Sequence, residues 1–134
     1  GGNGTYANPK SRVLFPFGYG LSYTTFEYGK PQIDGNKVTV TVKNTGKVAG
    51  KEIVQWYVGD DKASVIRPKK ELKHFEKIAL APGEEKTVTY TIADKDLEFF
   101  DENQHAWVSE AGSFTISVAS SSVDVKGSVK YVKK

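Results

Sequence analysis

The sequence predicts an all-β domain: an antiparallel two-sheet sandwich of seven to eight strands, preceded by an irregular N-terminal arm. From residue 33 onward, apolar and polar residues alternate with a period of two in short runs, as in strands with one buried face. Turn-forming stretches such as Asn44-Thr45-Gly46 and Pro82-Gly83 separate these runs. β-Branched and aromatic residues are abundant, whereas the strong helix formers Ala and Leu are scarce.

Length and charge exclude several classes of protein. The 134 residues are enough for one domain with a buried core. Because the chain has no cysteine and only two histidines, we expect no disulfide, no thiolate or multi-histidine metal site, and no cofactor. No apolar run is long enough to span a membrane. The net charge is +3, but the lysines are interspersed with acids and the only arginines are Arg12 and Arg67, so we expect no nucleic-acid partner.

The first 31 residues differ in pattern from the rest. We expect a connecting arm or linker over 1–31 and the sandwich domain over 32–134, and the opening Gly1-Gly2 suggests a piece of a longer chain. Residues 13–26 are very aromatic, but Pro16, Gly18 and Gly20 are expected to interrupt a regular strand. So apolar a segment needs a surface to pack on. We therefore predict interdomain contacts at Phe15, Phe17, Tyr19, Leu21, Tyr23 and Phe26, with Arg67 as a further candidate.

Two strands open the sandwich. Residues 38–43 alternate Val with Thr and Lys, which indicates a strand with one buried face. Residues 53–58 are apolar on both faces, which indicates a central strand or one that another element covers. Trp56 lies in the middle of this strand, so we expect it in the core. A longer loop over 59–70 follows.

The remaining strands follow in the second half of the chain. The run 72–80 alternates imperfectly, which indicates a β-bulge. Further strands or short apolar elements are expected at 87–92, 97–100, 106–108 and 114–119. The last run is expected to place on one face Val123, Val125, Val129 and Tyr131. This succession is typical of an immunoglobulin or fibronectin type III sandwich, with a small barrel as the alternative.

No arrangement of residues points to a self-contained active site. Asp60-Asp61 offers too few oxygens for calcium, and we expect the acids of 94–102 to be surface residues at turns rather than a glycosidase pair. His105 lies beside these acids, but no nucleophile elbow is present for a serine triad. Gly18-Tyr19-Gly20 lacks the third glycine and the helix of a phosphate loop. Trp107 is open to three interpretations: a sheet edge, an interdomain contact or a sugar-stacking residue.

Several motifs occur in a fixed order. They are LFPFGYGLSYTTF at 14–26, VKNTG at 42–46, EIVQWYV at 52–58, RPKKELKHF at 67–75, LAPGE at 80–84, LEFFD at 97–101 and EAGSF at 110–114. This series resembles the C-terminal, fibronectin type III-like domain of family 3 glycoside hydrolases, the β-glucosidase and β-xylosidase family. Ala111 departs from the family pattern, which commonly has proline there.

The resemblance implies an accessory domain that follows a TIM-barrel domain and an α/β sandwich domain. In that family the barrel carries the nucleophilic Asp, the sandwich domain usually carries the acid/base Glu, and the parent reaction is retaining hydrolysis of a terminal β-linked sugar. No position of this chain matches either catalytic motif, so we expect no catalytic residue in it. The implied partner is the set of catalytic domains of its own parent chain. The alternative is an independent carbohydrate-binding or adhesive module.

Overall fold

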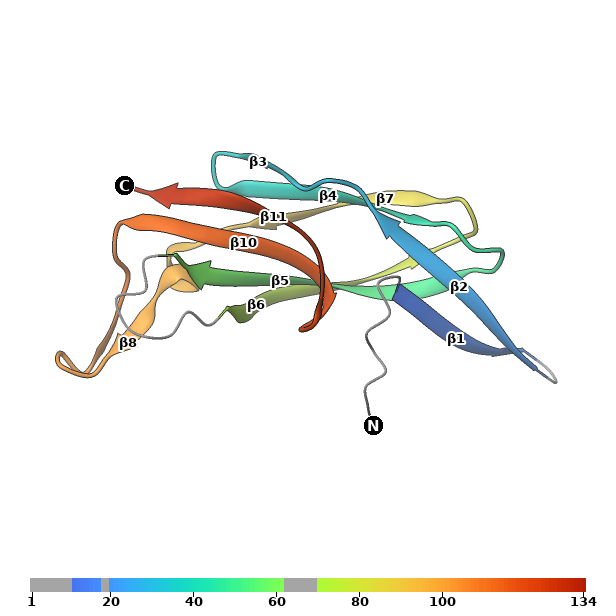
Figure 1. The fold of residues 1–134 in the computed structure, drawn as a ribbon, viewed down its shortest axis with the longest axis horizontal. Coiled ribbons are helices and arrows are strands. Elements are labelled where there is room, and N and C mark those ends of the chain that lie inside the picture. The colour runs from blue at the N-terminus through green and yellow to red at the C-terminus, as the bar shows by residue number, and fades with distance from the viewer. Residues whose placement is uncertain (1–10, 18–19, 62–69) are drawn as a thin grey trace.

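The computed structural model describes residues 11–17, 20–61 and 70–134, with the backbone alone for the described residues up to Tyr23. These residues contain eleven strands and one short 3₁₀ helix (Figure 1). The elements are β1 (Ser11–Phe17), β2 (Gly20–Tyr28), β3 (Gln32–Asp34), β4 (Lys37–Asn44), β5 (Gly50–Asp60), β6 (Glu71–Leu80), β7 (Glu85–Thr91), η2 (Asp94–Leu97), β8 (Phe99–Asp101), β9 (Ala106–Val108), β10 (Gly112–Ser121) and β11 (Asp124–Lys133).

The strands form two main antiparallel sheets. One has the order β1-β2-β4-β3, with β7 on the other edge of β4, and the second has the order β11-β10-β5-β6. A separate two-stranded hairpin, β8–β9, projects from one end of the sandwich (Figure 1). The predicted all-β, two-sheet architecture is confirmed. The structure has more strands than the predicted seven to eight for two reasons. β3, β8 and β9 are only three residues long, which makes them hard to identify from alternation, and the β1–β2 segment forms regular strands where an irregular arm was expected.

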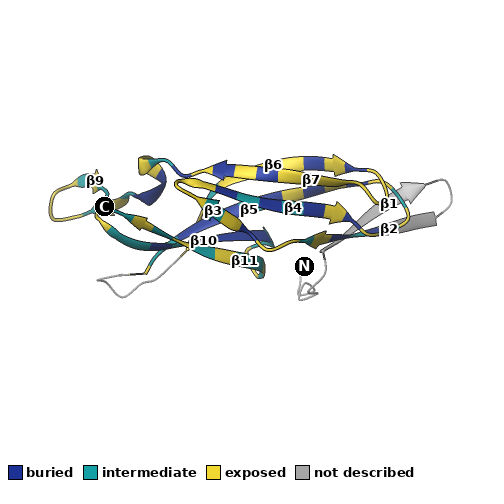
Figure 2. Cartoon of the chain, turned by 90° about the horizontal axis from the view of Figure 1, so that it is seen from above, coloured by how far each residue is buried: buried dark blue, intermediate teal, exposed yellow. Residues whose placement is uncertain are grey.

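The core lies between the two sheets. The period-two pattern of β4 buries Val38, Val40 and Val42, and Figure 2 shows the same alternation along β7. Trp56 is 0% exposed, as the sequence predicted, and its ring stacks on Tyr90 of the opposite sheet with centroids 5.5 Å apart. These side chains belong to one continuous apolar cluster, so the sheets are held together mainly by hydrophobic burial.

Two tyrosines, the half-buried Tyr28 and the buried Tyr90, donate to carboxylates. Tyr28 on β2 donates to Glu52 Oε2 on β5 at 2.8 Å, and this bond joins the two sheets. Tyr90 donates to Asp96 Oδ2 at 2.7 Å, and this bond fixes η2 on the end of the core. Burial, followed by the partner carboxylates, raises the pKa of both phenols far above its ordinary value. Both hydroxyls therefore stay protonated and available as donors.

Asn44, at the end of β4, is fully buried and has all its side-chain hydrogen-bonding capacity satisfied. Its Nδ2 donates to the carbonyls of Val48 at 2.9 Å and Leu80 at 3.0 Å. Its Oδ1 accepts from Thr24 Oγ1 at 2.5 Å and from the Gly46 amide at 2.9 Å. Gly46 approaches Thr24 so closely that a β-carbon on it would lie 2.8 Å from the Thr24 Cα. One amide thus connects β2, the β4–β5 loop and the end of β6.

The expected interruption of the N-terminal segment is wrong. β1 and β2 pair without a register shift from Ser11↔Phe26 to Phe17↔Gly20. β1 is an edge strand, paired with β2 alone, so the missing amide proton of Pro16 can face away from the ladder. Residues 26–28 of β2 also pair with β4, which joins this segment to the sandwich. The boundary between a 1–31 arm and a 32–134 domain remains a prediction.

The four-stranded sheet has three register shifts, which leave Lys73 of β6, Ser120 of β10 and Lys126 of β11 without partner positions, and those at Lys73 and Lys126 determine which residues face the core. The bulge predicted in 72–80 is confirmed, because Trp56 pairs with His74 and Tyr57 with Leu72, which leaves Lys73 as the extra residue. A second bulge leaves Lys126 without a partner position in the β10–β11 pairing. It inverts the alternation, so Val129 and Tyr131 pack against the core whereas Val123 and Val125 are exposed. The prediction of one shared face for these four residues is therefore wrong.

We predict that Asn44→Ala destabilises the fold by about 3 kcal/mol, because it leaves buried backbone groups without partners. The matched control is Asn36→Ala: the Asn36 side chain makes one hydrogen bond, to the Ile92 carbonyl at 3.2 Å, so about 1 kcal/mol or less is expected. Urea unfolding at unchanged m-value measures both. Equal losses for the two variants would contradict the role given to Asn44.

The two tryptophans provide a second test. Trp56→Ala should cost about 3–5 kcal/mol, as for other buried large aromatics. Trp107 is 64% exposed, so Trp107→Ala should change stability by less than about 0.5 kcal/mol. Thermal unfolding of both variants measures the contrast. A small loss for Trp56→Ala would mean that its ring is not part of the core.

Candidate interaction surface

The two outer faces of the sandwich differ in chemistry. The outward positions of β4 and β7 carry threonine, lysine and glutamate, as expected of a face in contact with water. The four-stranded sheet instead exposes large apolar side chains: Phe75 is 60% exposed, Leu72 46% and Ile53 42%. This confirms that β5 is apolar on both faces, and it makes the outer face of the four-stranded sheet a candidate binding surface.

The pairing register defines this surface across all four strands. Phe75 on β6 pairs with Gln55 on β5, Gln55 pairs with Ala119 on β10, and Ala119 pairs with Val125 on β11. Residues that are directly opposite share one side of a sheet, so these four form a row on the outer face, in which Phe75 and Val125 are exposed and Ala119 is buried. We call this face, with Ile53 and Leu72, the outer apolar face.

The β1–β2 hairpin extends beyond the sandwich as a two-stranded ribbon (Figure 1). Only residues 26–28 of β2 pair with β4, so most of the hairpin has no third strand. The register places Val13, Phe15 and Phe17 in one row and Leu14 and Leu21 in the other. A two-stranded hairpin is marginally stable alone, and further strands or packing on another element make it stable.

The predicted interdomain residues are placed differently by the structure. Phe26 is 3% exposed and belongs to this chain's own core, so its side chain is not part of a surface. The backbones of Phe15, Phe17, Leu21 and Tyr23 lie in the β1–β2 hairpin, where their side chains are not described. Tyr19 and Arg67 lie outside the described residues. Interdomain contact at the six predicted residues that remain once Phe26 is excluded is still a prediction.

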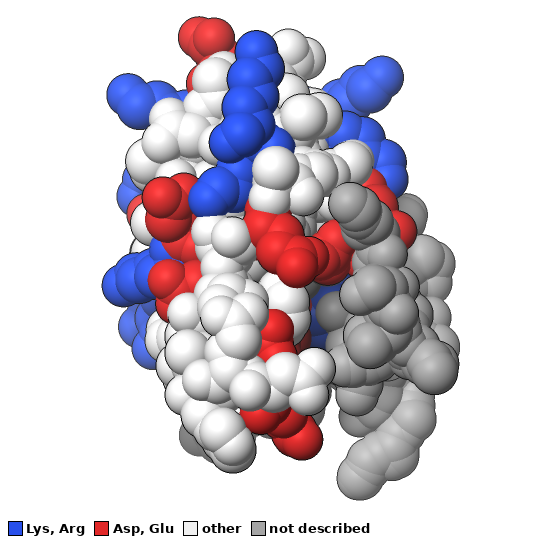
Figure 3. All heavy atoms as spheres, turned by 90° about the vertical axis from the view of Figure 1, so that its left-hand side faces the viewer, with Lys and Arg blue, Asp and Glu red and all other residues white. Residues whose placement is uncertain are grey.

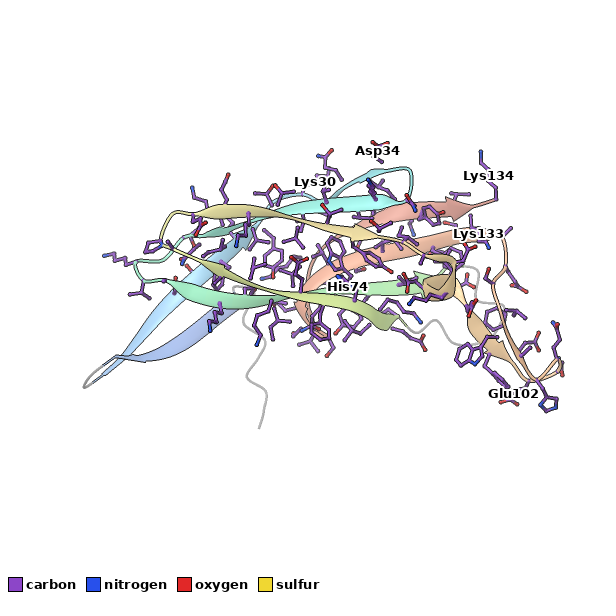
Figure 4. All side chains as sticks on the ribbon, turned by 180° about the vertical axis from the view of Figure 1, so that it is seen from behind. Lys30, Asp34, His74, Glu102, Lys133 and Lys134 are labelled. Atoms are coloured by element: carbon purple, nitrogen blue, oxygen red, sulfur yellow. The ribbon has the colours of Figure 1, made fainter. Side chains whose placement is uncertain are left out.

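The β8–β9 hairpin presents a second exposed apolar group. Phe100 and Trp107 are direct cross-strand partners, and their rings make an edge-on contact with centroids 5.6 Å apart. Figures 1 and 4 show that this hairpin and β1–β2 leave opposite ends of the sandwich and both bend toward the side of the four-stranded sheet. The two hairpins therefore extend on the same side of the molecule as the outer apolar face.

Acidic residues gather at the β8–β9 end (Figure 3). A cavity of about 260 Å³ there is lined by Asp60, Glu71, Asp96 and Glu98, together with Lys73. Asp96 is buried and accepts from Tyr90 and from the Ala93 amide, and Glu71 forms an ion pair with Lys73 at 3.0 Å. The prediction of surface acids is thus wrong for Asp96, which supports the fold. These contacts give Asp96 and Glu71 partners within the fold.

Asp61 anchors the C-terminal end of β5 to two neighbouring strands. Its carboxylate accepts from Thr115 at 2.6 Å, Ser113 at 2.8 Å and Lys130 Nζ at 3.0 Å. Partial burial opposes ionisation, but the hydrogen bonds from Thr115, Lys130 and Ser113 and the charge of Lys130 outweigh it and lower the Asp61 pKa. The Asp61 carboxylate is therefore ionised, and its oxygens already accept hydrogen bonds from three side chains.

Among the described residues, no three histidine, cysteine, aspartate or glutamate side chains are grouped so that they could hold a metal ion. Within the same part of the chain, no helix has the length and apolar character needed to cross a membrane.

Sequence reasoning missed the outer apolar face as a unit. The apolar character of residues 53–58 on both faces was a correct signal, but it did not identify the neighbouring strands. Phe75 and Leu72 fall on the same face only because the bulge at Lys73 shifts the register between them. Phe75 and Val125 are 50 positions apart in sequence, and only the strand order β11-β10-β5-β6 places them in one row.

Comparisons with known proteins agree with the fold. The sequence model of the family described as fibronectin type III-like domain matches residues 52–122. The chain is 54% identical to β-glucosidase BoGH3A of Bacteroides ovatus over 134 aligned positions, which cover 94% of this chain and 18% of that protein. It is 48% identical to a β-xylosidase of Formosa agariphila, covering 90% of this chain and 18% of that protein.

Solved structures give the same result. The β-glucosidase of Kluyveromyces marxianus, in complex with glucose, matches with a TM-score of 0.75 and 44% identity over 90% of this chain and 15% of that one. DesR, a β-glucosidase from Streptomyces venezuelae in complex with D-glucose, matches with a TM-score of 0.75 and 40% identity over 90% of this chain and 16% of that one. The chain therefore spans less than a fifth of the length of these relatives.

Proposed function

The chain belongs to the fibronectin type III-like domain family, and we propose that it acts as the non-catalytic accessory domain of a family 3 glycoside hydrolase. The parent would be a β-glucosidase or β-xylosidase that hydrolyses O-glycosyl bonds with residues outside this chain. The domain would stabilise that enzyme by packing on its α/β sandwich domain. Similarity to a short part of much longer β-glucosidases and a β-xylosidase supports this proposal.

The contrast between the two outer faces carries the proposal. A free-standing sandwich gains nothing from Phe75, Leu72 and Ile53 on its surface, whereas a domain that packs on a neighbour buries them. Burial of about 400 Å² of apolar surface contributes on the order of 10 kcal/mol before ordering costs. The β1–β2 hairpin, with Phe15, Phe17, Leu21 and Tyr23, would extend the same contact, with Tyr19 and Arg67 as further candidates.

The alternative is an independent carbohydrate-binding or adhesive module. Such a module would bind its ligand on a surface that is complete within this chain. Its outer apolar face would then serve the ligand and not a neighbouring domain. The two functions are distinguished by whether substitutions on that face change the stability of the intact enzyme.

We predict that Phe75→Asp leaves the isolated chain within about 0.5 kcal/mol of wild type, since the side chain is mostly exposed. In the full-length enzyme the same change should lower the temperature of half-inactivation by several degrees, because it places a charge in an apolar contact. Leu21→Asp in the β1–β2 hairpin should act in the same direction. Thermal inactivation of the full-length variants measures both.

Thr89→Asp is the matched control, because Thr89 is an exposed strand residue on the other outer face. It introduces the same residue with a similar loss of strand propensity, and it should leave the full-length enzyme unchanged. If Phe75→Asp and Thr89→Asp behave alike in the full-length enzyme, the outer apolar face is not a domain contact.

A separate prediction concerns activity. The isolated chain, at high concentration, should release no more product from aryl β-glucosides and aryl β-xylosides than buffer does, because Asp96 and Glu71 at its acidic end already have partners within the fold. Turnover that persists through repurification and disappears on replacing Glu98 would assign the chain its own active site.

A further inference from the structure

We propose that the β8–β9 hairpin contains a contact site for a single neutral pyranose ring, formed by Trp107 and Phe100 with the polar side chains of the hairpin turn. This inference goes beyond the accessory role, because the site is complete within this chain. It requires no docking on another domain.

The ring geometry leaves a stacking surface open. Trp107 is the more exposed of the two rings, at 64% against 44% for Phe100. The rings meet at 72°, and an edge-on contact covers at most one face of either ring. Their cross-strand pairing on a short hairpin fixes both side chains on one side of the ladder. The indole is therefore held in place with an apolar face free for a ligand.

Polar groups lie in the turn of the same hairpin. Glu102 and His105 are exposed in the turn between the two strands and have no hydrogen-bond partner among the described residues. Figure 4 shows Glu102 at the far end of the hairpin, directed away from the sandwich. Asp101, in contrast, uses its carboxylate to hold the turn, accepting from the Asn103 amide at 2.9 Å and from Gln104 Nε2 at 3.0 Å. The turn is thus fixed while two polar side chains stay available.

This combination fits a sugar better than the other ligands that exposed aromatics bind. A pyranose has an apolar C–H face that can lie on an aromatic ring and a rim of hydroxyls that can bond to Glu102 and His105. An anionic ligand such as a nucleic acid would be repelled, because acidic side chains gather at this end of the molecule (Figure 3). Two rings provide far less area than the roughly 800 Å² per partner of a stable protein interface, so by themselves they do not form one.

The intrinsic fluorescence of the chain gives a direct test, because it has two tryptophans and Trp56 is fully buried. The isolated chain is titrated with glucose, xylose and cellobiose, and with mannitol as an open-chain polyol of similar composition. We expect a saturable change in emission for the cyclic sugars and none for mannitol. Half-saturation should lie at millimolar concentrations, since one stacking contact gives weak binding.

Two variants assign the signal. Trp107→Ala removes the reporting tryptophan, so binding to this variant is followed by the amide chemical shifts of residues 99–108. We expect no saturable change in these shifts. Phe75→Ala removes a similarly exposed aromatic side chain from the outer apolar face and should leave the response unchanged. A response that is linear, equal for mannitol, or retained in Trp107→Ala would overturn the proposal. Such a result leaves the accessory role intact, because that role is tested by the inactivation of Phe75→Asp in the full-length enzyme.

Discussion

The buried amide of Asn44 is the polar contact on which the arrangement of this domain depends. Hydrophobic burial holds two sheets together without fixing how they are aligned, because it has no direction. The four hydrogen bonds of Asn44 do have direction, and they join β2 and β4 of one sheet to the end of β6 in the other. They also fix where β2 leaves the sandwich, and therefore the position of the β1–β2 hairpin. A buried amide with every bond made specifies one arrangement among many apolar ones.

The sequence predicted those parts of the fold that depend on local alternation. Clean runs such as 38–43 and 87–92 gave the correct strands and the correct buried face, and Trp56 was correctly placed in the core. The errors arose where one residue or one neighbour changes the outcome. The bulge at Lys126 exposes Val125, and the edge position of β1 allows a strand through Pro16. Neither bulge position nor strand order is encoded in a local pattern.

The candidate surface was harder to predict than the fold. Its residues come from β5, β6, β10 and β11, so they are neighbours only after the sheet has formed. Asp96 was also misplaced by sequence pattern alone. Five acids in a short stretch suggest a solvated turn, yet Asp96 is buried and accepts a hydrogen bond from the Tyr90 hydroxyl. The outward threonines of β4 and β7 complete the contrast: the two sheets share a core but present different surfaces.

The bulge at Lys73 has a consequence for how this domain behaves when separated from a partner. β6 is one of the two edge strands of its sheet, and a flat, apolar edge strand allows other copies to add strands and build fibrils. The extra residue twists that strand locally, and lysine side chains stand at positions 73 and 77 beside Phe75. Such features oppose strand addition while leaving the apolar side chains accessible. The outer apolar face can therefore stay available for contact with another domain while the edge of β6 resists amyloid-like strand addition.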